Sequence, residues 1–393
     1  MNICIRADAS VEIGSGHVMR CLTLAAALRE RGAVVQFVCR EFPGNLCATI
    51  EQQGFAVHTL PRPSEQEGGK LTAASLYERW LGVSWERDAQ ETAAVCQRFA
   101  LDWLVVDHYG IDARWHKCLR PFVRNILCID DLANRPLECD LMLDQNLYDN
   151  AKERYTPYLA PHTITLLEPK YALLREEFRQ KRDIAQQKNH QKARQHQQDR
   201  KIHQIFVFFG GSDPSNVTAH AVRALQSLVY EGVALQADIV VGIANPHKDQ
   251  IAALCKTMPQ TQFHCHVPNM ADLMLRADLA LGAGGSTTWE RCCLGVPTLA
   301  VIIAENQREM TETAARHGIQ HNMGWHEDLT VEQIADTVRE YLSKPDTLRQ
   351  MSANAQKLVD GYGTQRVVEA MIHQSITTHI LTDTRKYPNK HYG

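Results

Sequence analysis

The sequence lacks the features of a membrane or nucleic-acid-binding protein. No window approaches the roughly 18 uninterrupted apolar residues of a membrane span. The formal net charge is only -3, so no overall positive field favours nucleic acid or an anionic membrane surface. The first residues contain neither a basic segment nor a long apolar run, and the 12 cysteines include no C-x-x-C spacing. We therefore expect a cytoplasmic protein whose thiols are reduced and act as small core residues.

Several short motifs that identify common enzyme classes are also missing. Gly14-x-Gly16 continues to Met19 instead of a third glycine, so the fingerprint G-x-G-x-x-G is incomplete and an NAD enzyme is disfavoured. No G-x-x-x-x-G-K-[ST] loop occurs, which argues against an ordinary NTPase. A D-x-D pair for a metal-bridged sugar nucleotide and a G-x-S-x-G elbow for acyl hydrolysis are absent as well. We expect neither a bound metal nor a cofactor.

Short apolar runs alternate with helical patterns along most of the chain. This rhythm predicts an α/β protein with parallel sheets and helices on both faces, and 393 residues suffice for two such doubly wound domains. The predicted strands of the first half are residues 3–5, 34–39, 55–60, 103–107, 125–130, 141–144 and 163–167. Those of the second half are residues 205–209, 238–241, 262–265, 279–281 and 298–303, followed by helices over 331–342, 347–359 and 365–374.

Composition suggests where these domains end. We expect a first domain over residues 1–179 and a linker or solvated helix over 180–201, which is rich in Gln, Lys and His. A second domain over 202–345 and terminal helices with a frayed polar tail over 346–393 would follow. Residues 62–83 form a polar, weakly periodic segment that we interpret as a long surface insertion able to cover a cleft.

His17 lies in a glycine-bracketed turn between the first strand and an amphipathic helix. Gly14 and Gly16 permit tight turn dihedrals and a close approach of a ligand to the backbone. A helix N-terminus disfavours an imidazolium, so we expect His17 to be neutral and able to act as a base. The alternative is a histidine that only caps the helix.

The second half contains two further glycine turns at strand ends. In one, the backbone N–H groups of Gly285, Ser286 and Thr287 could bind a diphosphate at the start of a helix, with Glu290 on the ribose hydroxyls. The other spans residues 210–216, where we expect Asp213 and Asn216 to contact the ligand. The alternative is two ordinary structural turns with helix caps.

Blocks of sequence in a constant order resemble a known family. They include RADAS, IGSGHVMRCLTLA, VVDHYGID, IDDLA, LDQNLY, KYALLREEF, FGGSDPSN, NMADLMLRADLALGAGGSTTWERCCLGVP and AENQ. Together they resemble the UDP-2,4-diacetamido-2,4,6-trideoxy-β-L-altropyranose hydrolases of pseudaminic acid biosynthesis, which are similar to GT-B glycosyltransferases. The resemblance covers about the first 320 residues. It does not extend to the Gln-rich linker, the length of the 62–83 insertion or the polar tail.

This resemblance implies a fold, a reaction and a role for each matching residue. The fold would be GT-B, two Rossmann-like domains facing across a cleft, with a C-terminal helix that often returns to the first domain. His17 would activate the water that attacks the anomeric carbon with inversion, and UDP and the free sugar would be released. The remaining matches would bind the substrate: Tyr109 and Asn306 in the sugar pocket, Val267 and Met270 in a uracil loop over 266–270, Ser286 and Thr287 at the phosphates, and Glu290 at the ribose.

Two other functions stay open at this point. A GT-B glycosyltransferase would use the same nucleotide site but transfer the sugar to a hydroxyl acceptor. A binding or regulatory protein would hold the nucleotide sugar without turnover. In each case we expect a monomer with a UDP-sugar ligand and neither nucleic acid nor a membrane as partner.

Overall fold

The computed structural model describes residues 1–63, 77–194, 203–265 and 267–386, and it divides the chain into two compact units. The first unit comprises Met1–Gln145, Asn150–Leu173 and Gly363–Gly393, and the second comprises Asn146–Asp149 and Leu174–Tyr362. This division differs from the four consecutive segments that we expected. The C-terminal helix belongs to the first unit, and residues 180–194 continue a helix of the second unit.

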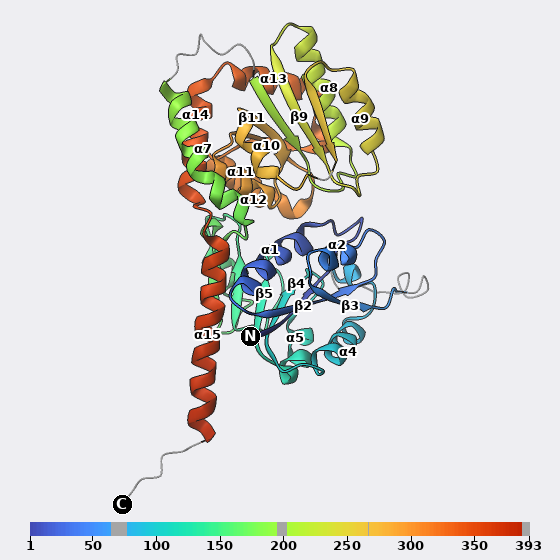
Figure 1. Ribbon diagram of the computed structural model, residues 1–393, viewed down its shortest axis with the longest axis vertical. Helices are drawn as coiled ribbons and strands as arrows, with labels where there is room; N and C mark the ends of the chain where they lie inside the picture. The colour runs from blue at the N-terminus through green and yellow to red at the C-terminus, as the bar shows by residue number, and fades with distance from the viewer. Residues whose placement is uncertain (64–76, 195–202, 266, 387–393) are drawn as a thin grey trace, which may run out of the picture. The chain divides into compact units, whose positions relative to one another are not determined.

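The first unit is built around a seven-stranded parallel sheet with the order β3-β2-β1-β4-β5-β6-β7 (Figure 1). Its strands are β1 (Asn2–Ala7), β2 (Val34–Arg40), β3 (Ala56–Leu60), β4 (Leu101–Asp107), β5 (Val123–Ile129), β6 (Leu141–Asp144) and β7 (Ile164–Leu167). The chain proceeds outward from β1 to β3 and then returns to the centre, so β1 pairs with both β2 and β4. In open α/β sheets, ligands bind at the carboxyl ends of the strands where the order reverses in this way.

Helices cover both faces of this sheet because its buried strands carry apolar side chains in both directions. Ile3 and Ile5 of β1 pack in one cluster with Val367, whereas Cys4 packs in the opposite cluster with Trp115. The first face is covered by α1 (Gly16–Glu30), α2 (Cys47–Gln52) and α15 (Gly363–Lys386). The second face is covered by α4 (Trp85–Cys96), α5 (Ala113–Leu119) and α6 (Ala151–Tyr155). Short 3-10 helices are η1 (Glu78–Leu81), η2 (Arg120–Phe122) and η3 (Pro169–Tyr171).

The second unit repeats this design around a six-stranded parallel sheet with the order β10-β9-β8-β11-β12-β13. The strands are β8 (His203–Phe208), β9 (Leu235–Val241), β10 (Thr261–Cys265), β11 (Leu279–Ala283), β12 (Thr298–Ile302) and β13 (His321–Trp325). The helices are α7 (Glu176–Arg194), α8 (Val217–Tyr230), α9 (Lys248–Lys256), α10 (Met270–Arg276), α11 (Thr287–Leu294), α12 (Arg308–Arg316), α13 (Val331–Leu342) and α14 (Pro345–Leu358), with η5 (Glu305–Gln307) and η6 (His326–Asp328). We did not predict β13, because its sequence HNMGW lacks the apolar run of a central strand.

Two expectations about polar segments need correction or restriction. Residues 379–393 are not a frayed tail throughout, because α15 continues to Lys386. Most of the insertion over 62–83 lies outside the described residues. Its last part contains η1, in which Leu81 is fully buried, and Val83 just after η1 is almost fully buried.

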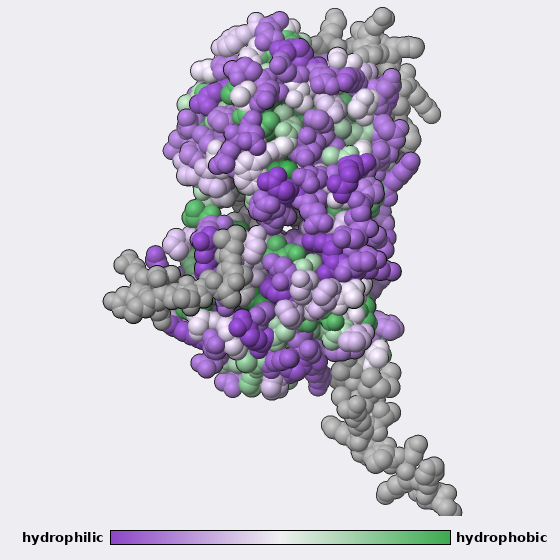
Figure 2. Space-filling view, turned by 180° about the vertical axis from the view of Figure 1, so that it is seen from behind, coloured by the Kyte–Doolittle hydropathy of each residue, from purple (hydrophilic) through white to green (hydrophobic). Residues whose placement is uncertain are grey.

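The face seen in Figure 2 is mostly hydrophilic, with apolar residues in small groups. In the part of the chain that the structure describes, no helix combines the length and the apolar character that a membrane crossing needs. All 12 cysteines are free, and most are buried as small core residues.

Candidate active site

His17 lies at the carboxyl edge of the first sheet, where β1 and β4 end side by side. It is the second residue of α1 and is only 7% exposed. Strand β4 ends at Asp107, which is paired in register with Ala7 at the end of β1. The Nδ1 atom of His17 lies 2.6 Å from Oδ1 of Asp107. The central crossover of the sheet thus joins two residues that are 90 positions apart in the sequence.

Asp107 is a fully buried carboxylate with two basic partners. Arg20, one helical turn after His17, donates from Nε to Oδ2 at 2.6 Å and from Nη2 to Oδ1 at 2.7 Å. Burial opposes the charged form, but the Arg20 charge, followed by the interaction with His17 and the Arg20 hydrogen bonds, holds the pKa of Asp107 well below its usual range. Asp107 is therefore ionised at neutral pH and can only accept hydrogen bonds.

This geometry fixes the tautomer of His17. An ionised carboxylate has no proton to donate, so the 2.6 Å contact requires the proton on Nδ1 of His17. Nη2 of Arg20 lies 3.3 Å from Nδ1 of His17. However, Nδ1 can form one hydrogen bond in the plane of the ring, and the shorter contact to Asp107 occupies that position. In the neutral imidazole the lone pair is then on Nε2, and the neighbouring carboxylate would stabilise the positive charge that forms when Nε2 takes up a proton.

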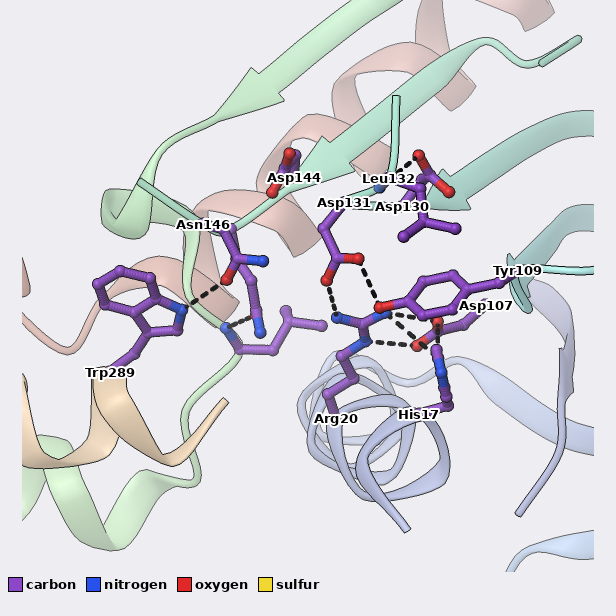
Figure 3. Close-up of polar contacts among 12 residues, drawn as sticks. His17, Arg20, Asp107, Tyr109, Asp130, Asp131, Leu132, Asp144, Asn146 and Trp289 are labelled. Atoms are coloured by element: carbon purple, nitrogen blue, oxygen red, sulfur yellow. Dashed lines mark hydrogen bonds and ion pairs between the residues drawn. The ribbon is translucent and has the colours of Figure 1, made fainter. Parts of the chain in front are cut away.

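A second carboxylate, Asp131, extends the network (Figure 3). Its Oδ1 accepts a hydrogen bond from Tyr109, and its Oδ2 lies 3.5 Å from Nη1 of Arg20. Burial, followed by the Asp131 charge, raises the pKa of Tyr109 well above its usual value, so the phenol keeps its proton. The Tyr109 ring meets the His17 ring edge to face with centroids 4.6 Å apart. Tyr109, which we predicted for the sugar pocket, thus lies directly against the predicted base.

An aromatic residue from the insertion completes this side of the site. The Trp80 ring stacks on Tyr109 with centroids 5.7 Å apart and lies 6.4 Å from the His17 ring.

Gly14 has a φ of +79°, which favours glycine, and a Cβ at Gly14 or Gly16 would meet no atom within 4 Å. The two glycines therefore leave open space in the turn before His17, and their contact with a substrate stays a prediction.

The second unit contains the glycine turn that we predicted as a phosphate site. It connects β11 to α11, with Ser286 as the N-cap residue and no side-chain cap. Within the described residues, no acceptor is recorded for the backbone N–H groups of Gly285, Ser286 and Thr287. The side chain of Gln307 of η5 lies beside the turn, 3.7 Å from a Cβ built at Gly285, and the predicted contact of the neighbouring Asn306 with the sugar stays a prediction. The predicted succession of strand, glycine turn and helix start is therefore present, and anion binding at this turn stays a prediction.

Glu290 in α11 is held by an arginine that we did not predict. Its Oε1 accepts from Nη2 of Arg175 at 3.2 Å, whereas its buried Oε2 has no recorded partner in the described part of the chain. Burial raises the pKa of Glu290 and Arg175 opposes the rise. Arg175 also pairs with Glu177, whose Oε2 accepts from the N–H of Ala271 at the start of α10. This chain of contacts connects Glu290 to the helix that begins at Met270.

The other predicted ligands of the second unit differ in what they contact. Asp213 is buried and its carboxylate accepts from the N–H groups of Val217 and Thr218 at 3.0 and 2.9 Å, so it caps α8. Asn216 donates to Gln250. Val267 is partly buried before α10, and position 266 of the predicted uracil loop lies outside the described residues. Substrate contacts of these residues stay predictions.

Sequence reasoning missed Asp107, Arg20, Asp131, Trp80 and Arg175. One signal was available for Arg20, because residues three apart share a helix face with His17. Asp107 and Asp131 both follow apolar strands, and aspartates at such strand ends point to the carboxyl edge of a parallel sheet. Their pairing with His17 and Arg20 depends on strand order, which no local pattern reveals.

Comparisons with known sequences connect this site to nucleotide-sugar enzymes. Residues 205–365 match the model of the glycosyltransferase family 28 C-terminal domain. The chain is 24% identical over 323 residues to UDP-2,4-diacetamido-2,4,6-trideoxy-beta-L-altropyranose hydrolase of Campylobacter jejuni, covering 81% of this chain and 98% of that protein. It is 23% identical over 371 residues to the spore coat polysaccharide biosynthesis protein SpsG of Bacillus subtilis, covering 93% and 96%. An uncharacterized protein of Methanocaldococcus jannaschii is 25% identical over 317 residues, which are 79% of this chain but only 57% of that protein.

Solved structures share the fold. MurG of Acinetobacter baumannii superposes with a TM-score of 0.60 at 14% identity, covering 95% of this chain and 99% of MurG. LpCGTa in complex with UDP superposes with a TM-score of 0.62 at 13% identity, with the same coverage of 95% and 99%. The predicted fold class is therefore confirmed: two parallel-sheet α/β domains of the GT-B type.

Proposed function

We propose that this chain hydrolyses a UDP-sugar to UDP and the free sugar, with UDP-2,4-diacetamido-2,4,6-trideoxy-β-L-altropyranose as substrate. The observation that carries the proposal is the His17–Asp107–Arg20 arrangement, which prepares one imidazole nitrogen as a base. The name of the Campylobacter relative supports the choice of reaction and substrate, and the similarity covers 98% of that protein.

The first unit would supply the activated water. Nε2 of His17 takes a proton from water as the water oxygen attacks the anomeric carbon. The bond between that carbon and the β-phosphate oxygen breaks, its electron pair leaves with UDP, and the configuration at carbon inverts. The proton resides on the imidazolium, which Asp107 stabilises through its short contact to Nδ1.

The second unit would bind the leaving group. The N–H groups of Gly285, Ser286 and Thr287 face the negative charge that grows on the diphosphate as the bond breaks. Glu290 keeps one buried carboxylate oxygen for ribose hydroxyls, although its other oxygen is held by Arg175. Because UDP is already a good leaving group and the turn stabilises it, the scheme uses no general acid.

Isotope labelling tests the bond that breaks. The full chain is incubated with the proposed UDP-sugar in ¹⁸O-water, and both products are examined by mass spectrometry. Label in the sugar supports attack at the anomeric carbon. Label in UDP would show P–O cleavage and contradict the role given to His17.

Two histidine variants test the base. His17→Ala is expected to lower kcat by about 10²- to 10⁴-fold, because the water loses its proton acceptor. His58→Ala is the matched control: this histidine lies in β3 of the same unit and contacts Gln36, so kcat should be unchanged. Equal activity of the two variants would contradict the mechanism.

A glycosyltransferase is the second candidate, supported by the likeness to MurG and LpCGTa and to a polysaccharide biosynthesis protein. In that reaction His17 would deprotonate an acceptor hydroxyl instead of water. If the UDP-sugar stays intact in water and is consumed only when an acceptor is added, the hydrolase proposal fails and the transferase takes its place.

A further inference from the structure

Arg291 is a buried cation for which the described part of the chain offers no carboxylate partner. It lies in α11 directly after Glu290 and is 1% exposed. Its Nη2 donates to the carbonyl of Ala283 at 2.8 Å and to Oγ1 of Thr288 at 3.1 Å. Within the described residues its Nε and Nη1 have no hydrogen-bond acceptor, and Arg291 forms no ion pair. Buried charges in proteins are normally paired, so this arrangement calls for a partner that the described residues do not supply.

The guanidinium of Arg291 lies beneath the glycine turn of the second unit. Nη2 contacts Ala283 at the end of β11 and Thr288 in the first turn of α11, so it spans both ends of the turn. Nη1 packs against Gly282, where an added Cβ would lie only 2.6 Å away. A full positive charge therefore lies on the inner side of the turn whose N–H groups of Gly285, Ser286 and Thr287 have no recorded acceptor.

Other polar atoms around the same turn are also buried without a recorded partner. Oγ1 of Thr311 is one of them, and it lies 1.9 Å from the position of a Cβ built at Gly284. Oε2 of Glu290 is another. A turn that served only to connect β11 to α11 would gain stability by satisfying these groups, so their common location points to a ligand.

Arg291 keeps its charge under physiological conditions. Burial lowers its pKa to about 10, and the nearby Cys292 and Glu290 oppose this only in part. Glu290 cannot serve as its ion-pair partner in this structure, because the Glu290 carboxylate contacts Arg175. The charge is therefore present at neutral pH and is not neutralised locally.

We propose that Arg291 is a positioning residue whose buried charge is the fixed counter-charge for the diphosphate of a bound nucleoside diphosphate. An α-helix start contributes only about half an elementary charge, whereas a diphosphate carries at least two. A guanidinium beneath the turn adds a full charge in surroundings that screen it poorly. Arg291 thus makes the turn selective for a diphosphate, and it stabilises the same group when it departs as a leaving group. This inference rests on the proposed function, because it takes the ligand to be UDP.

Binding of UDP and of uridine separates a charge effect from a structural one. Isothermal titration of the full chain is carried out with wild type, Arg291→Met and Arg291→Lys. The methionine variant is expected to weaken UDP binding by at least about tenfold while uridine binding stays within about twofold. The lysine variant keeps the charge and should retain most of the preference for UDP. Arg276→Met removes a half-exposed cation of the same unit, paired with Asp238, and should change neither affinity.

The outcomes are distinct. An unchanged UDP affinity in Arg291→Met, or an equal loss of UDP and uridine binding, overturns the inference. If the methionine variant does not fold, Arg291→Gln gives the same test, because glutamine is neutral and can still donate to the Ala283 carbonyl. Inorganic pyrophosphate is the second probe, and it is titrated into wild type and Arg291→Met. Binding of pyrophosphate that depends on Arg291, without binding of UDP, would contradict the proposed function but support the counter-charge. Binding of neither would overturn both.

Discussion

Replacement of Asp107 by asparagine is the sharpest test of the site in the first unit. Asparagine has the same shape but no charge, and its side chain presents one acceptor and one donor group. Asp107 receives hydrogen bonds from His17 and, twice, from Arg20. The amide oxygen cannot satisfy all of these donors, so the NH₂ group must face either a donor of Arg20 or Nδ1 of His17.

The effect on catalysis follows from the His17 tautomer. If the new NH₂ group faces Nδ1, this nitrogen must accept, and the proton moves to Nε2, where the base is needed. If the oxygen faces Nδ1, the imidazolium loses a charged partner. Either way we expect kcat to fall by about 10²- to 10⁴-fold. UDP affinity should be unchanged, because the predicted nucleotide ligands lie in the second unit.

The effect on stability follows from Arg20, which is almost completely buried. Removal of one partner from a buried ion pair costs about 3 to 5 kcal/mol, and the retained hydrogen bond reduces this to about 2 to 3 kcal/mol. For a unit of this size the melting temperature should fall by about 5 to 10 °C. Asp88→Asn is the matched control, because Asp88 is equally buried and pairs with Arg6 and Arg40.

The assay compares both variants at a temperature where each is folded. UDP release is followed under single turnover, and melting is followed by calorimetry. Asp88→Asn should lose stability but keep kcat within about threefold, since Asp88 does not contact His17. If Asp107→Asn also keeps its kcat, or if both variants lose activity equally, Asp107 does not act through His17 and the reasoning is refuted.

Three further predictions concern pH, the glycine turn and a helix cap. Because the pKa of Asp107 is lower in the folded than in the unfolded state, its stabilising contribution is complete above about pH 4 and is lost as the pH falls further. The free energy of unfolding should therefore depend less steeply on pH below about 4 in Asp107→Asn than in wild type, and an unchanged slope would contradict this. Gly284→Ala places a Cβ 1.9 Å from Oγ1 of Thr311, so it should lower the free energy of unfolding by about 1 to 3 kcal/mol and weaken UDP binding. Gly285→Ala is the control, because the nearest atom lies 3.7 Å from its Cβ and its melting temperature should equal that of wild type. The reverse order of the two variants in calorimetry and titration would refute the turn geometry. Asp213→Ala removes the α8 cap and should lower the unfolding free energy by about 1 to 2 kcal/mol in urea, and a neutral result would show that the cap is dispensable.

The strands were predictable because burial on both faces of a parallel sheet requires continuous apolar runs. The run over 103–107, for example, lies inside β4, and 141–144 coincides with β6. Strand β13 was not predictable, since its polar edge residues His321 and Asn322 carry no such run. Polar composition predicts a frayed tail where α15 in fact extends beyond Gln374, and no glycine or proline occurs between Gln374 and Lys386 to end the helix.

The site was only partly predictable for a related reason. His17 and the turn at Gly285 are local features, in which a strand, a glycine turn and a helix follow one another in sequence. Arg291 carried no signal, because an arginine inside an amphipathic helix ordinarily reaches solvent. Its burial beneath Gly282 depends on how α11 packs on β11.

The sequence by itself determined the alternation of strands and helices, the glycine turns and the position of His17 at a helix start. These follow from side-chain periodicity and backbone freedom within a few residues. Only the tertiary structure decided that β1 lies beside β4, and with it that Asp107 reaches His17. Strand order results from the packing of the whole sheet, so the carboxylate that pairs with His17 is set by contacts between residues far apart in the chain.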